Sequence, residues 1–202
     1  VGTNTITVVM KDTGGTTSGG RDAATNTFSI GVTPVNDAAY FVGLKSKTIL
    51  EDVLTNTVVV TVIDHDSASS NLVLTATSSD TNLATVAITA TNFVSATNTA
   101  YTLALPPQTN AFGSLTIMLV ANDGALDTTN SFLLTITGVN DQPSFAVSTN
   151  LVLVGEDVGF VTNANFLTSI SAGPTNESNQ SWTFTLTSGT NFGYVLAPSI
   201  ST

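Results

Sequence analysis

The sequence predicts an all-β protein made of tandem immunoglobulin-like Greek-key β-sandwiches, with one complete repeat flanked by two partial ones. Three observations support this fold class. Residues 25–41 (TNTFSIGVTPVNDAAYF) recur as residues 129–145 (TNSFLLTITGVNDQPSF), and this displacement of 104 positions is about the length of one small β domain. The dominant residues are Thr, Val, Ala, Asn, Ser and Leu, a mix that favours short pleated strands over helices. Apolar residues alternate with polar ones, and no window is better described by helical spacing.

Each copy of the repeated stretch is predicted to be a last strand followed by a junction. In the first copy, the alternating residues Phe28, Ile30 and Val32 lead into residues 35–37, Val-Asn-Asp. The second copy repeats this pattern up to residues 139–141. Asn and Asp end a strand because their short side chains hydrogen-bond nearby backbone. A new apolar run follows each copy, so the stretch marks the place where one domain ends and the next begins.

Residues 1–37 are predicted to be the C-terminal part of one repeat. Ile6, Val8 and Met10 alternate along one strand, residues 14–20 form a glycine-rich loop, and residues 28–32 form the final strand. Two strands cannot bury an adequate core in water. Something else must therefore complete this partial repeat.

Residues 38–141 are predicted to be the complete repeat. Turn residues separate its strands, and the pair Pro106-Pro107 ends the fifth strand because proline cannot donate to a sheet ladder. The expected strands lie near residues 48–50, 58–63, 72–77, 85–89, 101–105, 115–121 and 132–137. Seven short strands in about 100 residues are typical of an immunoglobulin-like sandwich.

Residues 142–202 are predicted to be the N-terminal part of the next repeat. The pair Glu156-Asp157 repeats Glu51-Asp52, and the alternating residues 182–186 repeat residues 72–76. We expect Trp182, together with Phe28, Phe132 and Phe184, to be a core aromatic residue. The head thus supplies the sixth and seventh strands of a repeat and the tail the first four. Two readings stay open: the chain is a window on a longer array, or copies of the chain complete each other's half repeats head to tail.

Composition limits the partners. Fourteen acidic against four basic residues give a formal charge of −10, which disfavours nucleic acid and favours divalent cations. The absence of cysteine excludes disulfides and thiolate zinc sites. No apolar run approaches the roughly 18–20 residues that span a bilayer, so we expect no direct membrane insertion. Because the chain begins inside a repeat, the missing signal peptide says nothing about secretion.

The acidic residues of the complete repeat lie at predicted strand ends and loops. If those near residues 36–37, 64–66 and 123 share one end of the sandwich, four or five oxygen ligands meet at the junction with the preceding repeat. Like charges a few ångströms apart repel by about 1–4 kcal/mol per pair near a protein surface, so such a cluster requires a counter-ion. Calcium, which takes 6–8 oxygen ligands, fits better than magnesium. Ordinary turn chemistry of Asp and Asn is the alternative.

Several motifs together resemble the cadherin repeat and its bacterial cadherin-like relatives. These are PVND before an apolar strand, an early Glu-Asp, Asp-x-Asp after the second strand, Asn-Asp-Gly after the sixth, and the run GPTNES at residues 173–178. The resemblance covers essentially the whole chain and implies calcium between successive domains. For the first junction the implied ligands are Asn36, Asp37, Asp64, Asp66 and Asp123. For the second junction they are Asn140, Asp141 and Glu51, with Glu177 replacing the missing Asp-x-Asp.

This sequence departs from the cadherin pattern in two places. Pro34 and Gly138 stand where cadherins carry an Asp two positions before the linker Asn, and there is no Asp-Arg-Glu ahead of the sixth strand. We therefore expect weaker or fewer ions at each junction than in cadherins, or none.

The resemblance favours a structural and adhesive module of a long extracellular surface protein or fibre. Its expected partners are neighbouring repeats or copies of the same chain, together with a cell-surface or matrix partner. An extracellular polysaccharide- or ligand-binding sandwich is the alternative, and it should show exposed aromatic residues on one face. We expect no enzymatic activity, because His65, the only histidine, has no second histidine or nucleophile beside it in a recognisable constellation.

Overall fold

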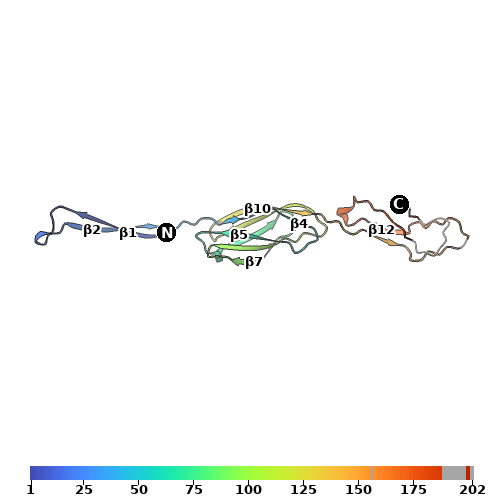
Figure 1. The fold of residues 1–202 in the computed structure, drawn as a ribbon, viewed down its shortest axis with the longest axis horizontal. Coiled ribbons are helices and arrows are strands. Elements are labelled where there is room, and N and C mark those ends of the chain that lie inside the picture. The colour runs from blue at the N-terminus through green and yellow to red at the C-terminus, as the bar shows by residue number, and fades with distance from the viewer. Residues whose placement is uncertain (156, 188–198, 201–202) are drawn as a thin grey trace.

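The protein is all-β, as the sequence predicts. The computed structural model describes residues 1–155, 157–187 and 199–200, and it places three parts along one line: an N-terminal hairpin, a central sandwich and a C-terminal segment (Figure 1). Its helices in these residues are single 3₁₀ turns, η1 (Thr17–Gly19), η2 (Ser69–Asn71) and η3 (Thr175–Glu177). None of the described helices is long and apolar enough to cross a bilayer.

The central part is a β-sandwich of two four-stranded sheets. One sheet has the order β4-β10-β9-β6 and the other has the order β3-β5-β8-β7. Neighbouring strands are antiparallel except β4, which runs parallel to β10. The strands are β3 (Tyr40–Val42), β4 (Lys47–Leu50), β5 (Thr57–Ile63), β6 (Val73–Ser78), β7 (Ala87–Phe93), β8 (Asn98–Ala104), β9 (Gly113–Asn122) and β10 (Asp127–Thr137). Each of the seven expected strands overlaps one of these.

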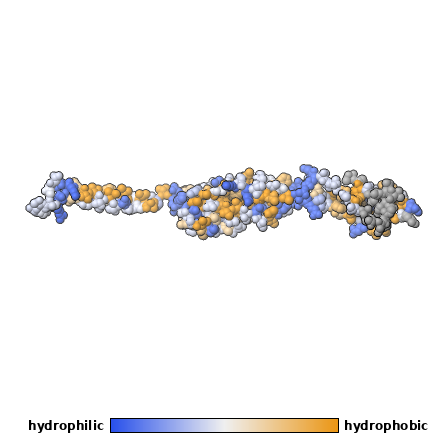
Figure 2. All heavy atoms as spheres, viewed as in Figure 1, coloured by the Kyte–Doolittle hydropathy of each residue, from blue (hydrophilic) through white to orange (hydrophobic). Residues whose placement is uncertain are grey.

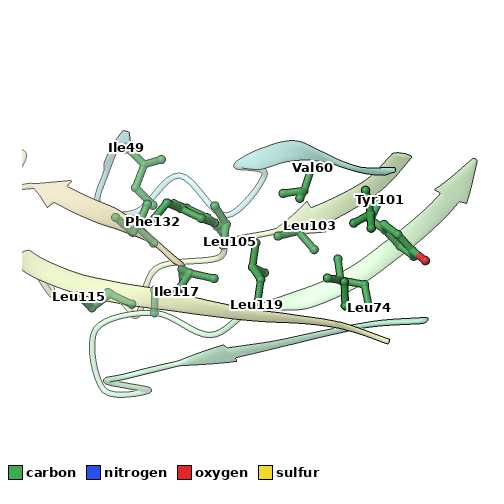
Figure 3. Packing of buried hydrophobic residues seen from close by; sticks show 14 of the residues in the cluster. Ile49, Val60, Leu74, Tyr101, Leu103, Leu105, Leu115, Ile117, Leu119 and Phe132 are labelled. Carbon is green, nitrogen blue, oxygen red and sulfur yellow. The ribbon is translucent and has the colours of Figure 1, made fainter. Parts of the chain in front are cut away.

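The core lies between the two sheets and comes from the alternating residues. Leu103 of β8 and Ile117 and Leu119 of β9 are completely buried, while their chain neighbours point outward (Figure 3). Phe132 of β10 packs into the same cluster and is 5% exposed. Each large apolar side chain buried in this way stabilises the fold by about 1.5–3 kcal/mol. The Tyr101 hydroxyl also reaches the core and donates to the carbonyl of Leu72.

One element of the sandwich was not expected. The sequence predicted a single first edge strand at residues 48–50, but the structure divides this role between β3 and β4. Gly43, with a φ of 70°, turns the chain between them, a backbone conformation that favours glycine. As a result β3 pairs with β5 in one sheet and β4 pairs with β10 in the other.

The N-terminal hairpin repeats the last hairpin of the sandwich, but no sheet in the described part of the chain packs on it. Strands β1 (Gly2–Lys11) and β2 (Ala23–Val32) pair antiparallel along their whole length. Phe28, expected in a core, is 54% exposed, whereas its counterpart Phe132 is 5% exposed. The prediction for Phe28 was therefore wrong for this chain, because none of the described residues forms a sheet over that face of the hairpin. Figure 2 shows apolar atoms along the hairpin surface.

The described residues of the C-terminal segment form fewer strands than the four that were expected. Its described strands are β11 (Ser144–Val147) and β12 (Leu167–Ser171), which pair antiparallel. The described residues 182–187 are not in a strand, and Trp182 is 43% exposed instead of buried in a core. The physical reason is a missing partner: in the sandwich, the equivalent strand β6 pairs with β9, and none of the described residues of this segment forms a counterpart of β9 beside it. Phe184, half-buried, packs edge-on against Phe145.

Candidate metal centres at the two ends of the sandwich

The first junction, between the hairpin and the sandwich, is organised by the linker residues Asn36 and Asp37. The Asn36 side-chain amide donates to a carboxylate oxygen of Asp123 at 3.0 Å. The backbone N–H of Asp37 donates to Oδ2 of Asp66 at 2.9 Å. The linker is thus bound to the loop after β5 and to the turn after β9, and all three loops meet at one end of the sandwich.

Asp64 and Asp123 anchor these two loops from inside. Oδ1 of Asp64 accepts the N–H groups of Asp66 and Ser67, and Oδ1 of Asp123 accepts those of Ala125 and Leu126. Both residues are buried, and Oδ2 of Asp64 has no hydrogen-bond partner. The structure therefore brings together all five residues predicted for this junction, with part of their oxygen capacity already used by backbone donors.

The second junction repeats the geometry of the first with one substitution. The Asn140 side-chain amide donates to the carbonyl of Asp141 at 2.9 Å, as Asn36 does to Asp37 at 3.2 Å. The N–H of Asp141 donates to Oε1 of Glu177 at 3.0 Å. Glu177 on η3 thus occupies the position that Asp66 holds at the first junction. The longer Glu side chain reaches the linker from η3. Gly173, just before η3, lies so close to the Glu177 carboxylate that a Cβ at this position would overlap it.

Two carboxylates of the sandwich and one of the linker converge at the second junction. One oxygen from each of Glu51, Asp52 and Asp141 lies within 4.8 Å of the other two. Glu51 follows β4 and is 1% exposed, and its Oε1 accepts the N–H of Val139 at 2.7 Å. Among the described residues, this is the group of acids close enough to share one ion. The sequence supplied more acids to the first junction, but the described part of the hairpin brings none there, because its acids Asp12 and Asp22 flank the opposite, turn end.

Buried oxygen atoms at the second junction lack partners. Oδ2 of Asp141, Oδ1 of Asn176 and Oε2 of Glu177 are buried without a hydrogen bond, and the Glu177 side chain is 8% exposed. A buried carboxylate oxygen without a donor is costly, since its desolvation is not compensated. A hollow of about 270 Å³ lined by Glu51, Asn140, Asn176 and Glu177 lies beside these atoms.

Sequence reasoning missed three participants in this site. Asp52 is held in the left-handed region (φ 63°), and its carboxylate accepts the N–H of Asn110 at 3.2 Å. The amide of Asn176 faces both oxygens of Glu51 at 3.4 and 3.5 Å. The amide of Gln180 donates to Oδ1 of Asn140 at 2.9 Å. The GPTNES run marked Asn176 for its resemblance alone, and only the packing of η3 against the sandwich shows its role.

The two junctions shift acid pKa values in opposite directions. The backbone N–H of Leu126, the Asn36 amide and the N–H of Ala125 lower the pKa of Asp123. The N–H of Asp37 lowers the pKa of Asp66 in the same way. Desolvation raises the pKa of Asp141, and the nearby charges of Asp52 and Glu177 raise it further. Burial and neighbouring charge therefore both disfavour the ionised form of Asp141 at the second junction.

We expect Asp141 to take up its proton at higher pH than Asp123 as the solution is acidified. The lowered pKa of Asp123 gives stability that is present above the ordinary Asp pKa and is lost as pH falls through the lowered value. The raised pKa of Asp141 has the opposite effect on stability. The charged side chain destabilises the fold above the raised pKa, and protonation at lower pH relieves this. Carboxyl carbon chemical shifts followed by NMR in calcium-free buffer measure the order. An Asp123 that titrates first would contradict this assignment.

The donor set at the second junction is suited to a hard cation. It offers carboxylate and amide oxygens and includes no histidine or cysteine. Calcium binds to oxygen ligands of this kind, whereas zinc and copper usually bind to histidine or cysteine. Glu51 and Asp52 come from the sandwich, Asp141 from the linker and Glu177 from η3, so a cation bound by all four would tie the sandwich to η3. Glu51, Asp52 and Asp141 would supply the charge, and Asn140, Asn176 and Glu177 the remaining oxygens.

The fold and these two ends define an all-β protein with a sandwich domain that carries acidic clusters at its junctions. No family model and no curated protein matches the chain. Solved structures similar to it include domains 4 and 5 of the S-layer protein SbsC, with 15% identity over 56% of this chain and 52% of that one and a TM-score of 0.36. The S-layer protein rSbsC(31-844) shares 15% identity over 84% of this chain and 25% of that one, with a TM-score of 0.38.

A third similar structure is an endo-fucoidan hydrolase from glycoside hydrolase family 107. It shares 15% identity over 68% of this chain and 19% of that one, with a TM-score of 0.34. The chain spans about half of the SbsC two-domain structure and a quarter or less of the larger ones. Similarities at this level assign neither a function nor a ligand to the chain.

Proposed function

We propose that the chain is a non-catalytic structural and adhesive module of a long extracellular surface protein or fibre, and that calcium at the junctions stiffens it. The observation that supports this most is the second junction. There, the carboxylates of Glu51 and Asp52 from the sandwich and of Asp141 from the linker lie within 4.8 Å of one another, beside buried oxygen atoms for which the described residues provide no partner. In its sequence motifs the module resembles a cadherin-like repeat, and we propose the cell surface as its location.

The proposed role of calcium follows from charge. In the absence of a cation, Asp52 and Glu177 repel Asp141, so the two sides of the linker push apart. A divalent ion would reverse the sign of this interaction and replace the missing hydrogen bonds of the buried oxygens. The linker at the junction would then be a rigid connection instead of a hinge, and the long surface protein or fibre would keep its length under load.

The test is to measure the shape and stability of the chain with and without calcium. We expect added calcium to raise the melting temperature, because an ion that binds the folded state stabilises it by mass action. Small-angle scattering should show a narrower distribution of maximum dimensions at the same time. Magnesium at equal concentration is the control, since it prefers a tighter octahedral shell and keeps its waters. Melting and scattering that do not change between calcium and chelator would exclude the ion bridge.

A further inference from the structure

The N-terminal hairpin has the strand register of a sheet centre but lacks the neighbouring strands. Phe28 lies opposite Ile6 across β1 and β2, as Phe132 lies opposite Ile117 across β9 and β10. In the sandwich, this face of the β9–β10 pair is core, and Leu134 and Ile136 are 0% and 2% exposed. In the hairpin the equivalent residues, Ile30 and Val32, are 50% and 60% exposed. The hairpin therefore exposes a surface that the same chain buries 104 positions later.

The C-terminal segment has the opposite defect. In the sandwich, the β9–β10 pair lies between β4 and β6, which have no other neighbours in that sheet. The sequence equivalents of these two outer strands are residues 152–154 and 182–186, and neither forms a strand in the structure. Their large side chains are exposed: Leu153 is 81%, Trp182 43% and Leu186 48% exposed. Leu72, the counterpart of Trp182, is 4% exposed in the sandwich. In its described residues, the segment thus lacks the two central strands of one sheet.

We propose that the β1–β2 hairpin of one copy inserts between residues 152–154 and 182–186 of a second copy, so that two chains together build one further sandwich. The template is the sandwich of the same chain, in which the order β4-β10-β9-β6 is complete. Residues 152–154 take the place of β4 and residues 182–186 the place of β6. The added hairpin supplies the backbone partners that both segments lack, and it buries the apolar face of β2 against β11 and β12.

A chain cannot complete its own segment in this way. The hairpin and the C-terminal segment lie at opposite ends of the sandwich (Figure 1). Residues 33–39, between β2 and β3, number seven and reach at most about 25 Å when fully extended. Strand β10 alone has eleven residues and is about 37 Å long. A hairpin that completes this segment in an assembly of these chains therefore comes from another copy. Because head and tail are different surfaces, the contact is heterologous, and it produces an open filament unless the rotation between successive copies closes a ring.

The assembly also supplies the carboxylates that the first junction lacks from the preceding repeat. Asp157 has a φ of 62°, almost identical to the 63° of Asp52, its counterpart in the acidic group of the second junction. In the combined sandwich, Asp157 of the copy that accepts the hairpin lies at the end next to Asn36 and Asp37 of the copy that donates it. Head-to-tail assembly needs no calcium, and it goes beyond the proposed function because its contacts are apolar and backbone contacts.

The experiment is sedimentation of the full chain over a range of concentrations in buffer with chelator, so that failure of the calcium proposal does not affect it. We expect the mass to increase with concentration. A head variant, Phe28→Asp with Ile30→Asp, and a tail variant, Trp182→Asp with Leu186→Asp, should each remain monomeric, because a buried unpaired carboxylate is prohibitive. Mixed in equal amounts, the two should form a 1:1 dimer that does not grow, since one keeps a working tail and the other a working head.

The control is Thr27→Asp with Ser29→Asp, on the outer face of the same strand, which should assemble like the unmodified chain. The four exposed positions of the head and tail variants lie outside the sandwich core, so each variant should retain the thermal transition of the sandwich. A chain that stays monomeric at every concentration would overturn the proposal and assign the hairpin face to a different occupant. An increase in the mass of the head variant with concentration, in the absence of the tail variant, would overturn the proposal as well.

Discussion

Replacing Asp141 by asparagine is expected to weaken calcium binding at the second junction by at least roughly 10- to 100-fold, the loss that changes next to a metal's ligands already cause. Asp141 is one of three carboxylates that converge there, and its Oδ2 is buried without a partner. Asparagine keeps the shape of the side chain but removes one negative charge. Isothermal titration of the full chain with calcium measures the change.

The same substitution should have the opposite effect when calcium is absent. Because desolvation, Asp52 and Glu177 raise the pKa of Asp141, its charge is unfavourable in the ion-free state. Asp141→Asn should therefore leave the melting temperature in chelator unchanged or higher, while it lowers the melting temperature in calcium. Asp80→Asn is the matched control: Asp80 lies in the loop after β6, outside the acidic group of the second junction, and its carboxylate accepts the nearby N–H of Asn82. Equal calcium affinities for Asp141→Asn and the control would contradict the site.

The two junctions should also differ from each other. Asp37 is the counterpart of Asp141, yet in the described structure the preceding hairpin brings no acid to its end of the sandwich. For the monomeric chain, Asp37→Asn should change calcium affinity less than Asp141→Asn does. If copies assemble head to tail, the effect of Asp37→Asn should increase with protein concentration.

Alternation and the internal repeat were enough to predict the sandwich, because both depend on side chains that face a core. Ile117, Leu119 and Phe132 belong to alternating patterns, and alternation of this kind predicts a half-buried strand and not a helix. The division of the first strand at Gly43 was not visible, since a single glycine marks a turn without showing which sheet each side joins. The missing strands near Trp182 were not visible either, because strand formation there depends on a partner and not on local propensity.

The acidic residues of the site were predicted from their places at strand ends and from the resemblance to the cadherin repeat, whereas their grouping required coordinates. The sequence left open whether Asp64, Asp66 and Asp123 share one end of the sandwich, and hydrogen bonds to the linker join their loops in the structure. The role of Asp52 depends on a left-handed backbone conformation, and that of Asn176 on how η3 packs. Neither leaves a periodic trace in the sequence. From the sequence alone, more acidic residues were expected at the first junction than at the second. The sequence shows which acids lie on one side of a linker, but it does not show which acids face them.

Replacing Phe132 by alanine is expected to lower the free energy of unfolding of the sandwich by about 3–5 kcal/mol, the usual cost of removing a buried aromatic ring. Phe132 is 5% exposed and packs with Ile117 and Leu119 in the core. The equivalent substitution Phe28→Ala should change this free energy by less than about 0.5 kcal/mol in the monomer, because surface substitutions usually stay within that range. Urea unfolding at concentrations that keep the chain monomeric measures both.

The two variants can be compared directly because the two phenylalanines have the same sequence context. Both follow Thr-Asn-x in a last strand, and both lie opposite an isoleucine across the hairpin. Any difference between the two variants therefore reports what covers the strand and not the strand itself. At concentrations where copies assemble, Phe28→Ala should become costly as well, since the ring is then buried. Equal losses for both variants in the monomer would mean that the hairpin is covered within a single chain, and the half repeats would need no second copy.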